Sequence, residues 1–115
     1  MYNCISIGSS LVDIFISSKD WEAKRNKNQQ ILTYGDKLDL SDFHIFTGGG
    51  ASNTAVALSR LGFKVAVISE TGQDEFSDLI IRDFEKEGVA TQLLVREKLE
   101  RTGGSVVLVT KDSER

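Results

Sequence analysis

The alternation of apolar and polar positions along the chain predicts strands and helices in turn. The apolar run CISI at residues 4–7 is followed by Gly8 and two serines, as expected for a buried strand entering a loop. The run VAVIS at residues 65–69 is rich in β-branched residues and is typical of a strand buried on both faces. Between these runs, apolar residues spaced three and four apart predict a helix that ends at Gly62. Its inner face is expected to carry Ala51, Ala55, Leu58 and Leu61.

A second helix is predicted within the sequence TGQDEFSDLIIRDFEKEG, residues 71–88. Asp74 is placed to cap its N-terminus, and Gly88 is placed to end it. The inner face is expected to consist of Phe76, Leu79, Ile80 and Phe84. Because strands and helices alternate, the order predicts an α/β domain with a parallel sheet.

Other segments interrupt this alternation. LVDIFIS at residues 11–17 is an apolar strand-like run around one carboxylate, Asp13. Residues 19–30 are polar and predict a loop, and residues 31–46 contain two strand-like pieces around Gly35. Two further strand-like runs, ATQLLVRE and GSVVLVT, lead into the turn-like KDSER at residues 111–115. A turn should be followed by a returning strand, so we expect the chain to be the front part of a longer protein.

Composition limits the function classes. With 115 residues and a net charge of −3, one small domain is expected, and neither nucleic acid nor an anionic membrane is an indicated partner. The single cysteine, Cys4, cannot form an intrachain disulfide and suits the reducing cytoplasm as a buried, inert thiol. The single histidine, His44, is expected on a strand near the surface. One cysteine and one histidine far apart in the sequence do not make a zinc site of the usual kind. Apolar runs fall short of the roughly 18 residues of a membrane span, and no signal peptide is apparent.

The sequence FTGGGASNTAVALSRLG, residues 46–62, contains the chemistry of most interest. Its glycines give G-x-G-x-x-N, which lacks the third glycine of the dinucleotide fingerprint and does not follow the first buried strand. No lysine follows the glycines as a P-loop requires. Both phosphate-binding interpretations are therefore disfavoured.

A neutral polyhydroxy ligand fits these residues better. Glycine lets the backbone approach a ligand closely, and amides at a helix start are expected to be open as donors. Asn53 offers both a donor and an acceptor, and Asp13 could accept hydrogen bonds from two vicinal hydroxyls. The residues alone leave two plainer alternatives open: a loop-to-helix turn with Asn53 in water, and Asp13 capping nearby amides.

Four segments in order resemble the ribokinase-like, pfkB-type carbohydrate kinases: IGSSLVD, TGGGASNTAVALSRLG, VAVISETGQDEFSDLIIRDFEKEGV and TGGSVVLVTKDSER. The family's first signature is a glycine pair, an asparagine, a small-residue helix ended by glycine, and a further glycine. Gly48, Gly49, Asn53, Gly62 and Gly72 occupy these places. The resemblance covers nearly the whole chain apart from residues 19–30.

The resemblance implies a three-layer α/β/α, Rossmann-like fold with a parallel sheet and a small β-sheet lid. Residues 1–115 would be the N-terminal part of the kinase domain, with lid segments at about 12–18, 31–46 and 91–110. By the same resemblance, Asp13 and Asn53 bind substrate hydroxyls, and the backbone of Gly48, Gly49 and Gly50 lines the sugar.

Two substitutions depart from the family pattern. Ser77 stands where many relatives carry glycine, which affects packing, and Gly50 stands where some carry a substrate-facing side chain. No Gly-Ala-Gly-Asp segment, which supplies the family's anion hole and catalytic aspartate, is present. We therefore expect no catalytic residue and no metal site in these 115 residues, and no bound cofactor, whereas the intact enzyme would use ATP and Mg²⁺.

The function implied is the substrate-binding part of a cytoplasmic sugar kinase. A nucleoside kinase of the same family is an alternative, because a nucleoside presents similar ribose hydroxyls. A non-catalytic sugar-binding module, or one that forms a homodimer through the lid, is the alternative outside the enzymes. The sequence leaves open whether Arg96, Arg101 or Thr102 touch substrate.

Overall fold

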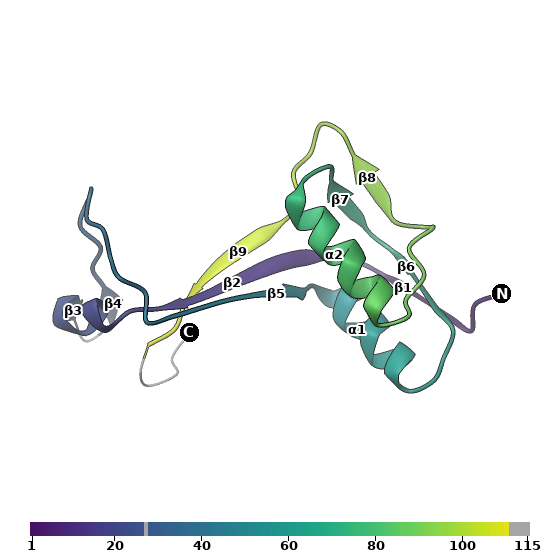
Figure 1. Ribbon diagram of the computed structural model, residues 1–115, viewed down its shortest axis with the longest axis horizontal. Coiled ribbons are helices and arrows are strands. Elements are labelled where there is room, and N and C mark those ends of the chain that lie inside the picture. The colour runs from purple at the N-terminus through teal and green to yellow at the C-terminus, as the bar shows by residue number, and fades with distance from the viewer. Residues whose placement is uncertain (27, 111–115) are drawn as a thin grey trace. The chain divides into compact units, whose positions relative to one another are not determined.

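The computed structural model describes residues 1–26 and 28–110, with the backbone alone described at residues 22–25. Figure 1 traces the chain through its helices and strands. The described residues form two compact units. Unit 1 comprises Met1–Asp13 and Phe46–Ser105, and unit 2 comprises Ile14–Ile45 with residues 106–110. The turn expected at residues 111–115 lies outside the described residues.

Unit 1 contains the predicted parallel pairing. Strand β1 (Cys4–Ile7) runs parallel to β6 (Val65–Ile68), with Cys4 opposite Val65 and Ile7 opposite Ile68. Helix α1 (Gly50–Arg60) packs against both strands. The prediction of an α/β fold with a parallel sheet is therefore confirmed.

A second parallel pair in unit 1 was not predicted. Strand β7 (Glu70–Gly72) pairs with β8 (Val95–Glu97), and the two lie side by side in Figure 1. A three-residue strand is too short to show an alternating pattern, so its sequence could not be separated from the start of the following helix. Of the run ATQLLVRE, residues 90–97, only β8 is a strand, together with a single parallel bridge from Ala90 to Ala66.

A third sheet has the strand order β5–β2–β9. Strand β2 covers Leu11–Ser17, β5 covers Asp42–Gly48 and β9 covers Gly104–Leu108. The boundary between the two units falls within each of these strands, so the part of the sheet in each unit is treated separately.

The core of unit 1 agrees with the predicted apolar faces of β6 and of the two helices, but not with the buried strand predicted at residues 4–7: in β1, Ile5 and Ile7 are 49 % and 72 % exposed. Val65, Ala66 and Val67 are all buried, as expected for a strand covered on both sides. The buried apolar helix positions are Ala51 and Ala55 on α1 and Ile80 and Phe84 on α2 (Glu75–Lys86). The expected helix residue Leu61 is an exception: α1 ends at Arg60, and Leu61 follows it with a 74 % exposed side chain. Its spacing matched the helical period, but the chain had already left the helix.

The predicted helix ends are confirmed. Gly62 and Gly88 both adopt positive φ, of 94° and 73°, shortly after the last residues of α1 and α2. Asp74 caps α2 by accepting a hydrogen bond from the backbone N–H of Ser77 at 3.0 Å. These signals are local, which is why the sequence alone revealed them.

Unit 2 differs from the sequence prediction in two places. The segment expected to be a polar loop contains a 3₁₀ helix, η1 (Lys19–Lys24), and the short antiparallel pair β3 (Arg25–Asn26) and β4 (Gln29–Gln30). Ser18 Oγ accepts from the backbone N–H of Asp20 at the start of η1, and this turn carries the buried Trp21. Residues 31–41 contain no strand, so the prediction of two strand-like pieces in residues 31–46 is wrong outside β5.

The sequence also predicted the exposure of two single residues, His44 and Cys4. His44 is exposed on β5, as predicted. Cys4 is free but only half-buried. Within the described residues, no helix combines the length and the apolar character needed to cross a membrane.

Candidate functional site

Asp13 lies in β2 on the sheet face that carries Leu11, because side chains alternate along a strand. Val12, between them, is fully buried on the other face. A Cβ added at Gly48 would lie 2.8 Å from Asp13 Oδ2 and 3.7 Å from Leu11 Cδ1, so Gly48 of β5 lies directly beside the carboxylate. On the other side, Ser105 Oγ of β9 donates a hydrogen bond to Asp13 Oδ1. Asp13 is therefore held between β5 and β9.

The opposite face of this part of the sheet is covered by α2. A Cβ at Gly104 would lie 3.2 Å from the ring of Phe76. Thr47 Oγ1 of β5 donates to Asp83 Oδ2 of α2 at 2.7 Å. Since α2 occupies that face, the half-buried Asp13 and the exposed Ser105 lie on the face away from α2.

The three glycines have different surroundings. Gly48 leaves space for Asp13, as described above. Gly49 has φ of 100°, and a Cβ there would lie 2.4 Å from the carbonyl oxygen of Ser9. Gly50 has nothing within 4 Å of an added Cβ, so it borders open space. Only Gly49 combines a backbone conformation that favours glycine with a steric requirement for it.

The expectation that the start of α1 offers several open amides is wrong. Ser9, in the β1–β2 loop, supplies acceptors for the first amides of the helix, and the helix cap carbonyl accepts the next. The bonds run from Gly50 N to Ser9 Oγ (3.1 Å), from Ala51 N and Ser52 N to Ser9 O (3.0 and 3.4 Å), and from Asn53 N to Gly49 O (2.9 Å). This helix is capped by a distant loop, which sequence spacing could not reveal.

The structure brings some of the expected site residues together and not others. Asp13 and Gly48 are neighbours, and Gly49 and Gly50 continue from Gly48 into α1. Asn53 is exposed in the first turn of α1, and its side chain makes no hydrogen bond to Asp13 in the part of the chain that the structure describes. All five residues belong to unit 1.

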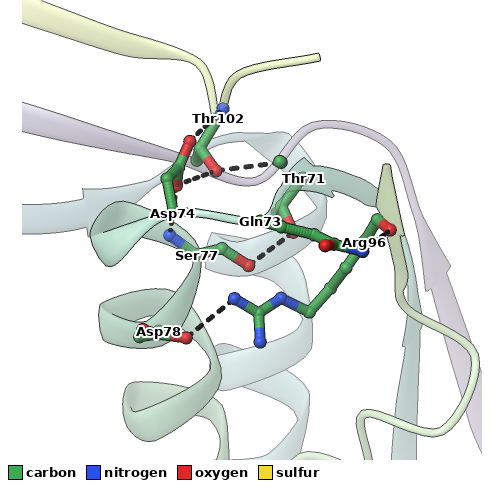
Figure 2. Close-up of polar contacts among 8 residues, drawn as sticks. Thr71, Gln73, Asp74, Ser77, Asp78, Arg96 and Thr102 are labelled. Atoms are coloured by element: carbon green, nitrogen blue, oxygen red, sulfur yellow. Dashed lines mark hydrogen bonds and ion pairs between the residues drawn. The ribbon is translucent and has the colours of Figure 1, made fainter. Parts of the chain in front are cut away.

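A second polar cluster joins α2 to the segment that precedes β9 (Figure 2). Thr102 donates twice to Asp74, from Oγ1 to Oδ1 at 2.6 Å and from its backbone N–H to Oδ2 at 2.9 Å. The Thr102 hydroxyl also accepts from the backbone N–H of Gly72 at 3.0 Å. Nearby, Thr71 and Ser77 join their buried hydroxyls at 2.7 Å. The cluster fixes where the chain enters β9.

These bonds alter the ionisation of Asp74. The Thr102 hydroxyl contributes most and the Thr102 amide next, and together they hold the pKa of the Asp74 carboxyl below its ordinary value. Burial opposes the change, and the Ser77 amide and the charge of Arg101 assist it. Asp74 is therefore ionised in the folded protein at neutral pH.

Sequence reasoning missed three of the residues that build this region. The expected site residues did not include Ser9, Thr102 or Ser105. For Thr102, the sequence left open whether it touches substrate. Ser105 lies 92 residues from Asp13, and Ser9 lies 41 residues from Gly50. The one usable signal was the pair of glycines at 103 and 104, since glycine within a strand pattern marks a close approach.

Comparison with solved structures defines the class of fold. The structure of Arabidopsis thaliana ribokinase complexed with ribose and ATP aligns with a TM-score of 0.82 at 19 % identity, over 98 % of this chain and 34 % of that one. A Methanocaldococcus jannaschii nucleoside kinase, described as an archaeal member of the ribokinase family, aligns at 0.75 and 18 % identity over 99 % and 35 %. At these identities the likeness concerns the fold, which is ribokinase-like.

Sequence comparison then gives the family. The pattern of the pfkB family carbohydrate kinases matches residues 6–115, and the chain belongs to that family. A ribokinase from Haemophilus influenzae is 38 % identical over 80 residues, which are 70 % of this chain and 26 % of that protein. The chain spans about a sixth to a third of the length of the curated relatives it matches.

Proposed function

We propose that these residues form the sugar-binding side of an ATP-dependent carbohydrate kinase. Asp13 accepts hydrogen bonds from substrate hydroxyls, Asn53 adds a donor and an acceptor, and the backbone of Gly48–Gly50 lines the sugar. Family membership supports a kinase that acts on a carbohydrate. The whole reaction would be transfer of the γ-phosphoryl group of ATP to a hydroxyl of the bound substrate.

The observation that carries the proposal is the setting of Asp13. An ionised carboxylate has about four acceptor positions, and Ser105 occupies one of them. The neighbouring strand places Gly48 beside the other oxygen, so no side chain from that position covers it. A half-buried carboxylate with acceptor positions that no described residue occupies suits neutral hydroxyl donors, because such bonds contribute roughly 1.5–3 kcal/mol each.

We further propose that the phosphoryl-transfer chemistry lies outside these residues. Among them, no group of three or more His, Cys, Asp or Glu side chains could hold a metal ion. The sequence also lacks the Gly-Ala-Gly-Asp segment. We therefore assign neither ATP nor Mg²⁺ to residues of this chain, and we place the nucleotide side of the reaction outside it.

The test uses the intact protein with ATP and D-ribose, D-fructose or adenosine as acceptors. We expect Asp13→Asn to lower kcat/KM for the preferred acceptor by about 10- to 100-fold, the loss of one or two charge-assisted hydrogen bonds. Asp20→Asn, at an exposed position of unit 2, is the matched control and should leave kcat/KM unchanged.

Several outcomes discriminate among the alternatives. Preference for adenosine would assign the protein to the nucleoside kinases, and preference for a free sugar to the carbohydrate kinases. Binding without phosphorylation of any acceptor would favour a non-catalytic module. Equal kcat/KM for Asp13→Asn and the wild type would remove Asp13 from the site.

Two further features follow from the family likeness as proposals. The first is a homodimer through the lid segments, which the exposed Phe43 and Ile45 of β5 support. Light scattering of the intact protein tests it, and a monomeric mass at micromolar concentration would reject it. The second is a cytoplasmic location, which fractionation of the source cells tests.

A further inference from the structure

Ser105 is the partner of Asp13, and its bond is not explained by burial. An ionised carboxylate can only accept, so the Ser105 hydroxyl must be the donor to Asp13 Oδ1. Ser105 is exposed, so water could satisfy its hydroxyl without Asp13. After donating, the Ser105 oxygen keeps lone pairs that can accept a hydrogen bond from a ligand.

Three residues beside this pair add no further polar side-chain atom. A Cβ added at Gly48 would lie close to both Asp13 Oδ2 and Leu11 Cδ1, and a Cβ at Gly103 would lie 3.6 Å from Leu11 Cβ. None of these three residues has a polar side-chain atom. Hydroxyls of a ligand that approaches this part of the sheet therefore meet two side-chain acceptors, Asp13 Oδ2 and Ser105 Oγ.

The backbone on the N-terminal side of Ser105 is firmly held. Asp74 accepts two hydrogen bonds from Thr102, which Figure 2 shows at the N-terminus of α2. The next residue, Gly103, accepts a bond from the backbone N–H of Val12 at 3.1 Å. Because Val12 precedes Asp13, these contacts fix the segment that carries the hydroxyl relative to the segment that carries the carboxylate. The pair is thus preorganised before a ligand arrives.

We propose that Ser105 is a specificity-determining residue that selects ligands with two adjacent hydroxyls. One hydroxyl donates to Asp13 Oδ2 and its neighbour donates to Ser105 Oγ, while the Ser105 proton holds Asp13 Oδ1 in place. This proposal rests on the proposed function, since it concerns the same carboxylate. A ligand that lacks one of the two hydroxyls uses Asp13 alone and gains nothing from Ser105.

The experiment compares ligands that differ by a single hydroxyl, with the intact protein. D-ribose is paired with 2-deoxy-D-ribose, and adenosine with 2′-deoxyadenosine; affinity is measured by calorimetry and kcat/KM by ADP release. Ser105→Ala should weaken the preferred hydroxylated ligand about five- to tenfold and its deoxy partner less than twofold, as the loss of one hydrogen bond predicts. The ratio between the partners therefore falls.

Matched variants separate this effect from a change in stability. Ser105→Thr keeps the hydroxyl and should retain the ratio, whereas Ser105→Val has the shape of threonine without the hydroxyl and should lose it. If the alanine variant does not fold, the threonine and valine pair decides. Ser59→Ala is the control. It removes a hydroxyl near the C-terminal end of α1 that donates to Glu87 O, and it should leave the ratio unchanged.

The two proposals fail in different ways. If Asp13→Asn weakens binding but Ser105→Ala and Ser105→Val keep the wild-type ratio, the role of Ser105 is refuted and the proposed function stands. If no probe binds the wild type, or if Asp13→Asn changes nothing, both fall. A ratio that falls equally in Ser105→Thr and Ser105→Val would also overturn the role of the hydroxyl.

Discussion

At the scale of single residues, three adjacent glycines that look alike in the sequence have separate roles. At Gly48, a side chain would overlap the Asp13 carboxylate. Gly49 adopts positive φ, and a side chain there would overlap the backbone of Ser9. Gly50 meets neither requirement and faces open space. The motif therefore combines two structural requirements with one position that a ligand can approach.

A pair of alanine substitutions tests this division. Gly49→Ala should lower the free energy of unfolding by roughly 1–3 kcal/mol from backbone strain, with more from the contact with Ser9 O. Gly50→Ala should change it by less than about 1 kcal/mol, and in the stabilising direction, since alanine favours helix over glycine. Urea unfolding of both variants measures the difference, and equal losses would contradict these separate roles.

At the scale of elements, the two helices of unit 1 are capped by different means. α2 carries its own cap, Asp74, one residue before its first turn, and the sequence predicted it. α1 has Gly49 at its cap position with no side-chain cap, and Ser9 from the β1–β2 loop replaces it. A cap in the adjacent sequence can be read from spacing, but one supplied by a distant loop cannot.

The Asp74 cap should make stability depend on pH. Its carboxyl pKa is lowered by folding, so the folded state binds this proton less readily than the unfolded state. The resulting stability is fully present above the unfolded pKa of about 3.9 and is lost as pH falls through the lower folded pKa. Asp74→Asn keeps a capping side chain but loses the charge, and should cost about 1 kcal/mol at neutral pH because the group is partly exposed.

Urea unfolding of the wild type and Asp74→Asn over a range of pH measures this effect. The difference between the two free energies of unfolding should be constant from about pH 5 to 8 and shrink below about pH 4. Taking the difference cancels the other carboxylates, including Glu87, whose pKa is lowered by its bond to Arg60. A difference that grows on acidification would show that Asp74 is not stabilised in its charged form.

At the scale of the whole molecule, our proposal gives the described residues a substrate-binding role and places the catalytic groups elsewhere in the intact enzyme. Asp13 and Ser105 carry side-chain oxygens that can accept hydrogen bonds from hydroxyls. The bond from Val12 N to Gly103 O holds together the two segments that carry them. Neither a metal-binding group nor the family's Gly-Ala-Gly-Asp segment accompanies them in the described residues. This division of binding and phosphoryl transfer between parts of the intact enzyme is a proposal, and it makes a prediction.

Residues 1–115 produced by themselves should therefore transfer no phosphoryl group. An ADP-release assay with ATP, Mg²⁺ and D-ribose, D-fructose or adenosine should give a rate equal to the protein-free blank. The intact protein, assayed in parallel, is the positive control. Turnover by the 115 residues that Asp13→Asn abolishes would contradict this expectation and would require a catalytic group within the chain.

The sequence by itself determined the parts of this protein that depend on neighbours along the chain. The helix ends at Gly62 and Gly88, the Asp74 cap and the buried β6 strand all follow from local spacing and backbone preference. The family likeness indicated Asp13 and Gly48 as site residues, and the structure places them side by side.

Only the tertiary structure decided which distant residues meet. Ser105 donates a hydrogen bond to Asp13, which is 92 residues away in the sequence. Ser9 accepts a hydrogen bond from the first amide of α1, which is 41 residues away. Strand β7 is a strand because β8 pairs with it, whereas residues 31–41, which lie in a segment predicted to be strand-like, form no strand. Strand pairing and hydrogen bonding between segments depend on where the folded chain brings them, and no local pattern encodes that meeting.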